Sequence, residues 1–134
     1  MLFLMILALL QAPIPLRPVA KGPTSGIESP RQVSVRTDTE WSDLWRAHAP
    51  NTQPALIDFS REMVLGVFLG TRATGGYSVE IVRTTAQASV GLIVEYVETA
   101  PARDAITAQL LTAPFHLVAV PKRDGDVRFQ KVDK

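Results

Sequence analysis

The run of residues 63–69 constrains the fold of this chain more than any other segment, because its sequence, MVLGVFL, contains no polar side chain. A strand with one face in water alternates apolar and polar residues, whereas a strand covered on both faces does not. The run therefore predicts a central strand of a sheet. Gly66 within it and Gly70 just after it indicate close packing or a bulge.

The clearest helix signal begins at Thr37, where Glu40 three residues later completes a capping box. Four residues then share one helical face, spaced i, i+3, i+4 and i+7: Trp41, Leu44, Trp45 and His48. Pro50 ends the helix. This stripe predicts the helix's contribution to the core; an aromatic platform for a ligand is the alternative.

Alternating apolar and polar residues predict further strands at 31–36, 77–81, 92–97, 115–120 and 127–129. The glycine pair Gly75-Gly76 predicts a tight reversal between the central strand and its neighbour, and Asp124-Gly125 predicts a hairpin before the last strand. Residues 102–112 fit an extended loop or a short strand. The sequence therefore predicts an α+β fold, a mainly antiparallel sheet of five to six strands with one amphipathic helix packed on it.

The N-terminus predicts export. Residues 1–10 (MLFLMILALL) are apolar without interruption, too few to span a bilayer but typical of the hydrophobic region of a signal peptide. We expect a leader over 1–20 and one domain over 21–134, in a periplasmic, cell-surface or secreted protein. The alternatives are an uncleaved N-terminal anchor, since no basic residue precedes the run, and a buried N-terminal strand.

Composition excludes several functions. The net charge of +1 over 134 residues, with basic residues dispersed along the chain, gives no reason to expect nucleic acid as a partner. Since the chain has no cysteine, it has no disulfide, no thiolate nucleophile and no cysteine-ligated zinc.

No catalytic set is visible in the sequence. His48 and His116 lack the spacing of a metal site, and we interpret both as structural, although carbonyls at the helix end would favour the charged form of His48. The glycines of 70–76 lack the lysine and the following helix that a phosphate loop needs. We therefore expect no catalytic residue, no metal and no cofactor. An enzyme with a convergent His48 or His116 is the remaining enzymatic alternative.

Four segments together resemble the PrcB C-terminal family, named after an accessory protein that stabilises a bacterial surface protease complex: 64–70, 74–81, 92–98 and 112–122. The more specific parts are the Gly75-Gly76-Tyr77 corner and the stretch from Thr112 to Lys122. The resemblance implies an exported, non-enzymatic protein-interaction domain that binds or stabilises a protease complex.

A second resemblance concerns loops alone. The corner with Thr74, Gly76 and Tyr77, followed by a late strand that opens with Pro114-Phe115, is similar to the loop motifs of chagasin-type inhibitors of papain-like cysteine proteases. Those domains are all-β sandwiches, whereas this sequence predicts a helix, and Ala73 stands where a proline is expected. If the corner contacts a partner, Tyr77 should stand in a groove near Phe115; if it only turns the chain, the ring should pack inward. The candidate interaction residues are Thr74, Gly75, Gly76, Tyr77, Pro114 and Phe115.

Overall fold

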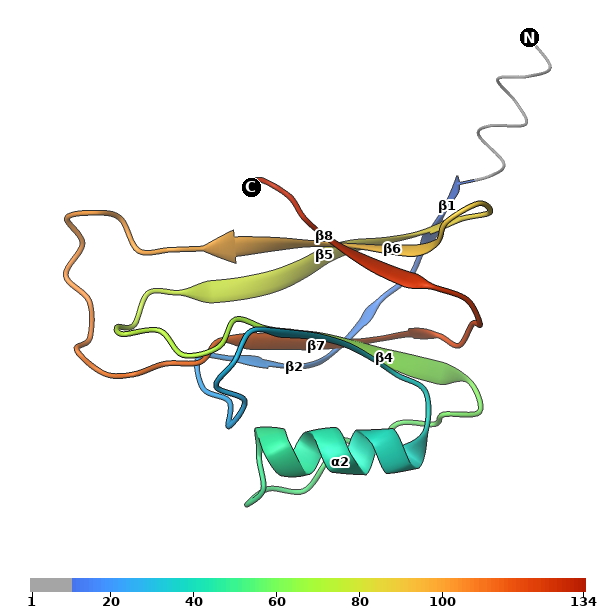
Figure 1. Cartoon of the computed structure of the whole chain (residues 1–134), viewed down its shortest axis with the longest axis horizontal. Helices are drawn as coiled ribbons and strands as arrows, with labels where there is room; N and C mark the ends of the chain where they lie inside the picture. Colours follow the sequence, from blue (N-terminus) through green and yellow to red (C-terminus); the bar gives the residue numbers. More distant parts are fainter. Residues whose placement is uncertain (1–10) are drawn as a thin grey trace, which may run out of the picture.

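The structure is a computed structural model that describes residues 11–134, and within them two four-stranded sheets and a helix form three layers (Figure 1). The outer sheet has the order β1-β5-β6-β8, formed by Gln11–Ile14, Ser78–Gln87, Gly91–Thr99 and Val127–Lys131. The middle sheet has the order β2-β7-β4-β3, formed by Arg17–Gly22, Phe115–Pro121, Glu62–Phe68 and Arg31–Val35. Helix α2, Asp38–His48, covers the other face of the middle sheet (Figure 1).

The α+β class is confirmed, but the single sheet of five to six strands is wrong, since the strands divide into two sheets of four. Pairing is mainly antiparallel as predicted, except that β8 runs parallel to β6. Alternation records which side chains of a strand face the core. It carries no information on which sheet the strand joins. The sequence therefore located the strands along the chain but could not assign them to two separate sheets.

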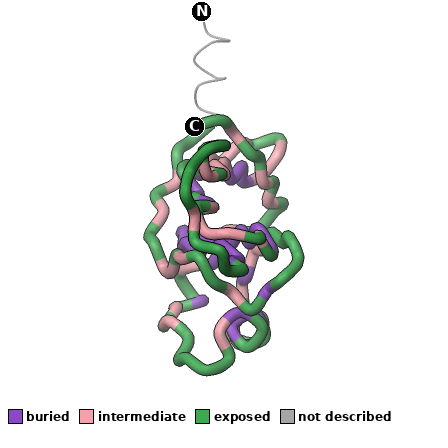
Figure 2. Tube along the Cα trace, turned by 90° about the vertical axis from the view of Figure 1, so that its left-hand side faces the viewer, coloured by how far each residue is buried: buried purple, intermediate pink, exposed green. Residues whose placement is uncertain are grey.

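The predicted central strand is confirmed as β4, which lies between β7 and β3. Its residues 63–68 are all buried, because the outer sheet covers one face of the middle sheet and α2 covers the other. Strand β5 of the outer sheet instead alternates exposed and buried residues over its first half, since one of its faces meets water. Figure 2 shows the buried segments gathered inside the molecule, with exposed segments around them.

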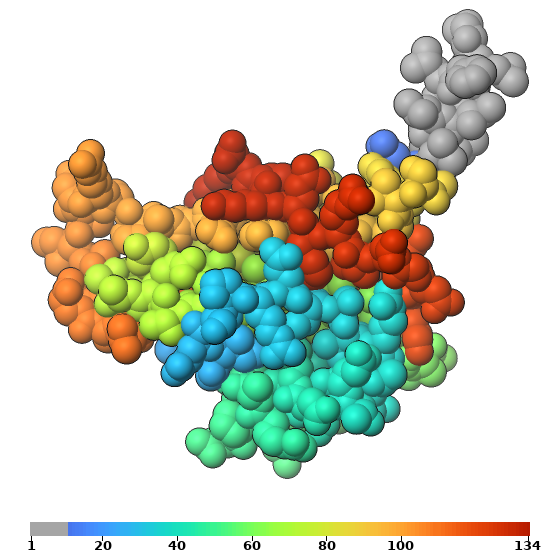
Figure 3. All heavy atoms as spheres, in the orientation of Figure 1, coloured from blue at the N-terminus to red at the C-terminus, as the bar shows by residue number. Residues whose placement is uncertain are grey.

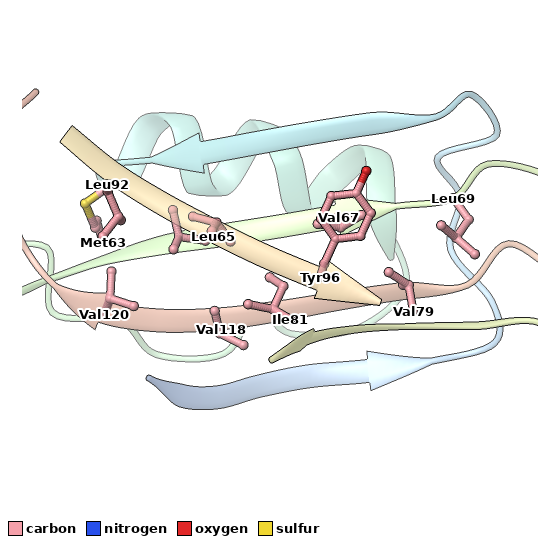
Figure 4. Packing of buried hydrophobic residues seen from close by; sticks show 11 residues of the cluster. Met63, Leu65, Val67, Leu69, Val79, Ile81, Leu92, Tyr96, Val118 and Val120 are labelled. Carbon is pink, nitrogen blue, oxygen red and sulfur yellow. The ribbon is translucent and has the colours of Figure 1, made fainter. Parts of the chain in front are cut away.

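Two apolar clusters fill the spaces between the layers. Figure 4 shows the cluster between the sheets, where Leu65 and Val67 of β4 lie among Val118 of β7, Ile81 of β5 and Tyr96 of β6. The cluster between the middle sheet and α2 contains Trp41, Leu44, Trp45, Phe68 and Phe115, among others. Alternate residues of β4 and β7 thus belong to different clusters, as the two-residue period of a strand requires.

Helix α2 matches its prediction closely. The Thr37 hydroxyl accepts a hydrogen bond from the Glu40 N–H at 3.2 Å, and the Glu40 carboxylate accepts one from the Arg36 N–H at 3.0 Å. The four predicted face residues are buried. The indole N–H of Trp41 donates to the Ala55 carbonyl at 2.9 Å, and that of Trp45 to Thr52. The stripe is therefore part of the core, and no exposed aromatic platform exists on this helix.

Both glycine turns were misassigned. Gly76 lies in a connection that leads from β4 in the middle sheet to β5 in the outer sheet, so it does not reverse the chain between paired neighbours. Gly125 likewise lies between β7 and β8, which belong to different sheets. Each has a positive φ, 91° and 102°. The left-handed conformation that the sequence indicated is present, but it serves a crossing between sheets and not a hairpin.

Residues 11–22 form strands at the sheet edges, β1 beside β5 and β2 beside β7. Ile14 and Leu16 pack against the cluster between the sheets. The apolar run 1–10 lies outside the described residues, and export stays a prediction.

Candidate interaction surface

The glycine corner lies at one end of the molecule, where it is held against the long connection between β6 and β7. The Gly75 N–H donates to the Ala108 carbonyl at 3.0 Å, and the Thr112 hydroxyl donates to the Thr74 carbonyl at 2.9 Å. At Gly76 an added Cβ would lie 2.8 Å from Cβ of Pro101, closer than a real contact allows. The corner is thus shaped for close contact between two connections.

The β6–β7 connection crosses from the outer to the middle sheet and carries exposed apolar side chains. Ile106 is fully exposed, Leu111 is 70 % exposed and Leu110 is 52 % exposed. The predicted loop at 102–112 is confirmed, with Thr112 forming an isolated bridge to Arg72. Long connections without regular structure are often binding segments.

We call residues 74–77 and 100–111 the end surface. In Figure 3 the loop, in orange, projects at the left end of the molecule, and the corner, in yellow-green, lies beside it. Its three large exposed apolar side chains were missed in the sequence. Their only signal is an ambiguous pattern, in which Ile106, Ala108 and Leu110 alternate as in a strand while Ile106 and Leu110 also fit one helical face. This pattern says nothing about exposure.

Tyr77 fits neither of its two expected positions. It is half-buried, and the Arg72 guanidinium lies over its ring, 5.7 Å from the centroid. Arg72 in turn donates to the Leu69 carbonyl at 2.9 Å, so the ring packs on a fixed cation at the rim of the end surface.

Pro114 and Phe115 lie inside the protein. Phe115 is only 8 % exposed, and its ring centroid is 4.2 Å from that of His48 and 6.2 Å from that of Phe68. Pro114 is buried, and its carbonyl accepts the Leu69 N–H at 2.9 Å. Of the six candidate residues, the structure therefore brings the four corner residues together at the surface and places the other two in the core.

The two histidines are buried in different layers. His116 points between the sheets, where its Nδ1 accepts the Ile81 N–H at 2.8 Å, at the bulge where β5 shifts register against β6. His48 lies on α2, with its Nδ1 2.8 Å from the Ser25 hydroxyl oxygen. Among residues 11–134, the hydrogen-bond partners of the two rings are a serine hydroxyl and a main-chain N–H, and neither is an acidic or basic side chain.

Burial lowers the pKa of both histidines below the ordinary value of 6.5. For His116 the charge of Lys21 lowers the pKa further, and the charge of Glu80 opposes this. The expectation that helix-end carbonyls would favour the charged form of His48 is wrong, because desolvation outweighs them. Both rings are held neutral and act as parts of the core.

Within residues 11–134, no three His, Asp or Glu side chains converge in a way that could hold a metal ion. No helix in the same range is long and apolar enough to cross a bilayer.

Taken together, these features define an α+β domain of two stacked sheets and one covering helix, with a loop-built surface at one end. Residues 63–121, from β4 through β7, match the model of a family described as PrcB C-terminal. This match supports the resemblance to the PrcB C-terminal family that the sequence motifs indicated. The family is one of accessory domains and not a known class of enzymes. Neither a search of curated proteins nor one of solved structures found a match.

Proposed function

We propose that this protein is an exported, non-enzymatic interaction domain that binds or stabilises a protease complex through its end surface. One observation carries the proposal: the family segment includes a loop whose Ile106, Leu110 and Leu111 are exposed to water. Exposed apolar clusters of this kind favour protein partners, since burying them on association releases water.

The way the loop is held also supports a binding role. The Ala108 carbonyl and the Thr112 main chain are fixed by hydrogen bonds to the corner and to Arg72. A loop whose conformation is set before binding loses less conformational freedom when a partner docks. The corner then has a defined task, which is to hold the apolar side chains in place.

The proposal is tested by purifying the protein with its complexes from the native cell and comparing two variants. The double variant Ile106→Asp, Leu111→Asp should remain folded and lose its partner, because charged side chains replace two exposed apolar ones. The control is Leu56→Asp. Leu56 is 97 % exposed and lies outside the end surface, between α2 and β4, so this variant should keep the partner. Equal recovery of the partner with both variants would exclude the end surface as the binding site.

Export is tested separately by cell fractionation. The full chain should be found outside the cytoplasm, and a chain without residues 2–10 should remain inside, because the apolar run is the segment that a secretion pathway recognises. Cytoplasmic location of the full chain would contradict this part of the proposal.

A papain-type protease inhibitor is the second candidate. The two-sheet sandwich with its corner and long loop at the same end favours it, while burial of Phe115 removes the aromatic side chain that such a loop set would use. An inhibitor should block papain-like proteases, and Gly76→Trp should abolish the effect. If no protease of a papain-like panel is inhibited and a protein partner is recovered, the inhibitor role is excluded and the accessory role is supported.

A further inference from the structure

The two sheets have four edge strands, and three of them carry features that discourage pairing with another chain. Strand β1 contains Pro13, and β2 contains Pro18 together with a register shift. Strand β8 carries the exposed charges Arg128 and Lys131. Proline, irregular register and charge are the usual protections of an exposed edge.

The fourth edge, β3, has one such feature, the exposed charge of Arg31 at its start. It pairs with β4 in continuous register from Arg31 to Val35, and its residues from Gln32 to Val35 include no proline and no charge. No residue of 11–134 makes a hydrogen bond to the backbone of 31–35 on the side away from β4. Figure 3 shows this segment, in light blue, at the surface above the helix. Its outward N–H and C=O groups are open to a further strand.

Open space flanks both sides of this edge. On the helix side, a hollow of about 450 Å³ is lined by β3 together with Glu40, Asp43 and Leu44 of α2. On the other side, a hollow of about 430 Å³ reaches Leu69, Arg72 and Tyr96. An added strand points alternate side chains to opposite faces, so both hollows can receive side chains of the same incoming strand.

The charge of β3 and the charges of α2 beside it are of opposite sign. Arg31 at the start of the strand is exposed and has no carboxylate partner among the described residues. At the other end, Glu40 lies beside the end of the strand, since it accepts the Arg36 N–H. Asp43 lies one helical turn further on; it is 3.6 Å from the Arg46 guanidinium, and 67 % of its side chain is exposed, so it can also meet a further cation. A basic residue at the start of β3 and acidic residues of α2 near its other end favour an antiparallel copy of the same chain.

We propose that the occupant of this edge is a second copy of the same chain, with the two β3 strands antiparallel and centred on Val33. In this register Arg31 lies opposite Val35 of the second copy and beside Glu40 and Asp43 of that copy. The symmetry produces this charge contact twice. The two middle sheets become one continuous eight-stranded sheet. The end surface stays free to bind the proposed protease partner.

Two measurements test the pairing directly. Light scattering after size-exclusion chromatography should give a mass that rises from one copy to two as concentration increases. The chain has no cysteine, so Val33→Cys should form an intermolecular disulfide on mild oxidation, because residue 33 faces its own counterpart. Ser89→Cys, on the exposed turn between β5 and β6, is the control and should form little. A monomer at every concentration up to the solubility limit, or equal crosslinking of the two variants, overturns the proposal.

A charge exchange tests the register. Arg31→Glu should weaken the dimer by about tenfold, since two attractive contacts become repulsive. Adding Asp43→Arg to it should restore association, while Arg103→Glu on the end surface should change nothing. If Arg31→Glu has no effect, or if the double variant stays as weak, the register is wrong. The two proposals can fail separately. If the variant Ile106→Asp, Leu111→Asp loses the protease partner but still dimerises, the end surface binds the partner and β3 forms the dimer independently.

Discussion

The two adjacent glycines of the corner are not equivalent. Gly76 has a φ of 91°, and an added Cβ would also approach Pro101, whereas at Gly75 the nearest atom to an added Cβ is Cβ of Ala108 at 3.5 Å, an ordinary contact. We predict that Gly76→Ala lowers the free energy of unfolding by about 1–3 kcal/mol, because it places a side chain in a left-handed conformation. Gly75→Ala should change it by less than about 0.5 kcal/mol. Urea unfolding of the two variants measures both, and equal losses would contradict the assignment.

A second prediction at this scale concerns the hydrogen bond between His116 of the middle sheet and Ile81 of the outer sheet. His116→Ala leaves the Ile81 N–H buried without an acceptor, and we expect a loss of about 1–3 kcal/mol in the free energy of unfolding. His116→Asn should recover part of this loss, since its side-chain oxygen can take the place of Nδ1. Urea unfolding again gives the values. If the alanine and asparagine variants lose equally, the ring acts only by filling space.

Among the elements, β1 and β2 decide whether the folded domain begins at Gln11 or at Lys21. A chain that starts at Lys21 lacks β1 and most of β2, and it uncovers the edges of β5 and β7. We predict that this chain is less stable than one starting at Gln11, and that it associates through its open edges. Thermal unfolding and light scattering compare the two chains. Equal stability would mean that the domain of 21–134 stands without them.

The sequence predicted individual elements well because each has a local physical cause. The capping box and the apolar stripe determine α2, and the uninterrupted apolar run determines β4. The division into two sheets has no local cause, since a turn around Gly125 looks the same whether the chain returns to its neighbour or crosses to another layer. The same lack of a local cause explains why the candidate site was only partly predicted. The corner could be found from its glycines, but the burial of Phe115 depends on the position of α2, far away in the sequence.

For the whole molecule, the two buried histidines predict how stability depends on pH. Their pKa values are lowered in the folded state, so the unfolded chain binds more protons once the pH falls below 6.5. The free energy of unfolding should therefore be highest above this pH. It should decrease as the pH falls from 6.5 toward the lowered pKa values of the two histidines. Urea unfolding at a series of pH values measures the slope. The double variant His48→Phe, His116→Asn should show a smaller slope between pH 6.5 and the acid range where carboxylates titrate; an unchanged slope would assign it to other groups.

The connections between the sheets have a consequence for how the chain folds in time. The chain changes sheet between β1 and β2, between β4 and β5, between β6 and β7, and between β7 and β8. Neither sheet can therefore be completed from a continuous stretch of chain, and Arg17 of β2 must wait for Ala119 of β7 before it has a partner. Non-local pairing of this kind is slow, with folding times typically between milliseconds and seconds. Strands β1 and β2 are synthesised before their partners β5 and β7, so they are among the last strands to be paired.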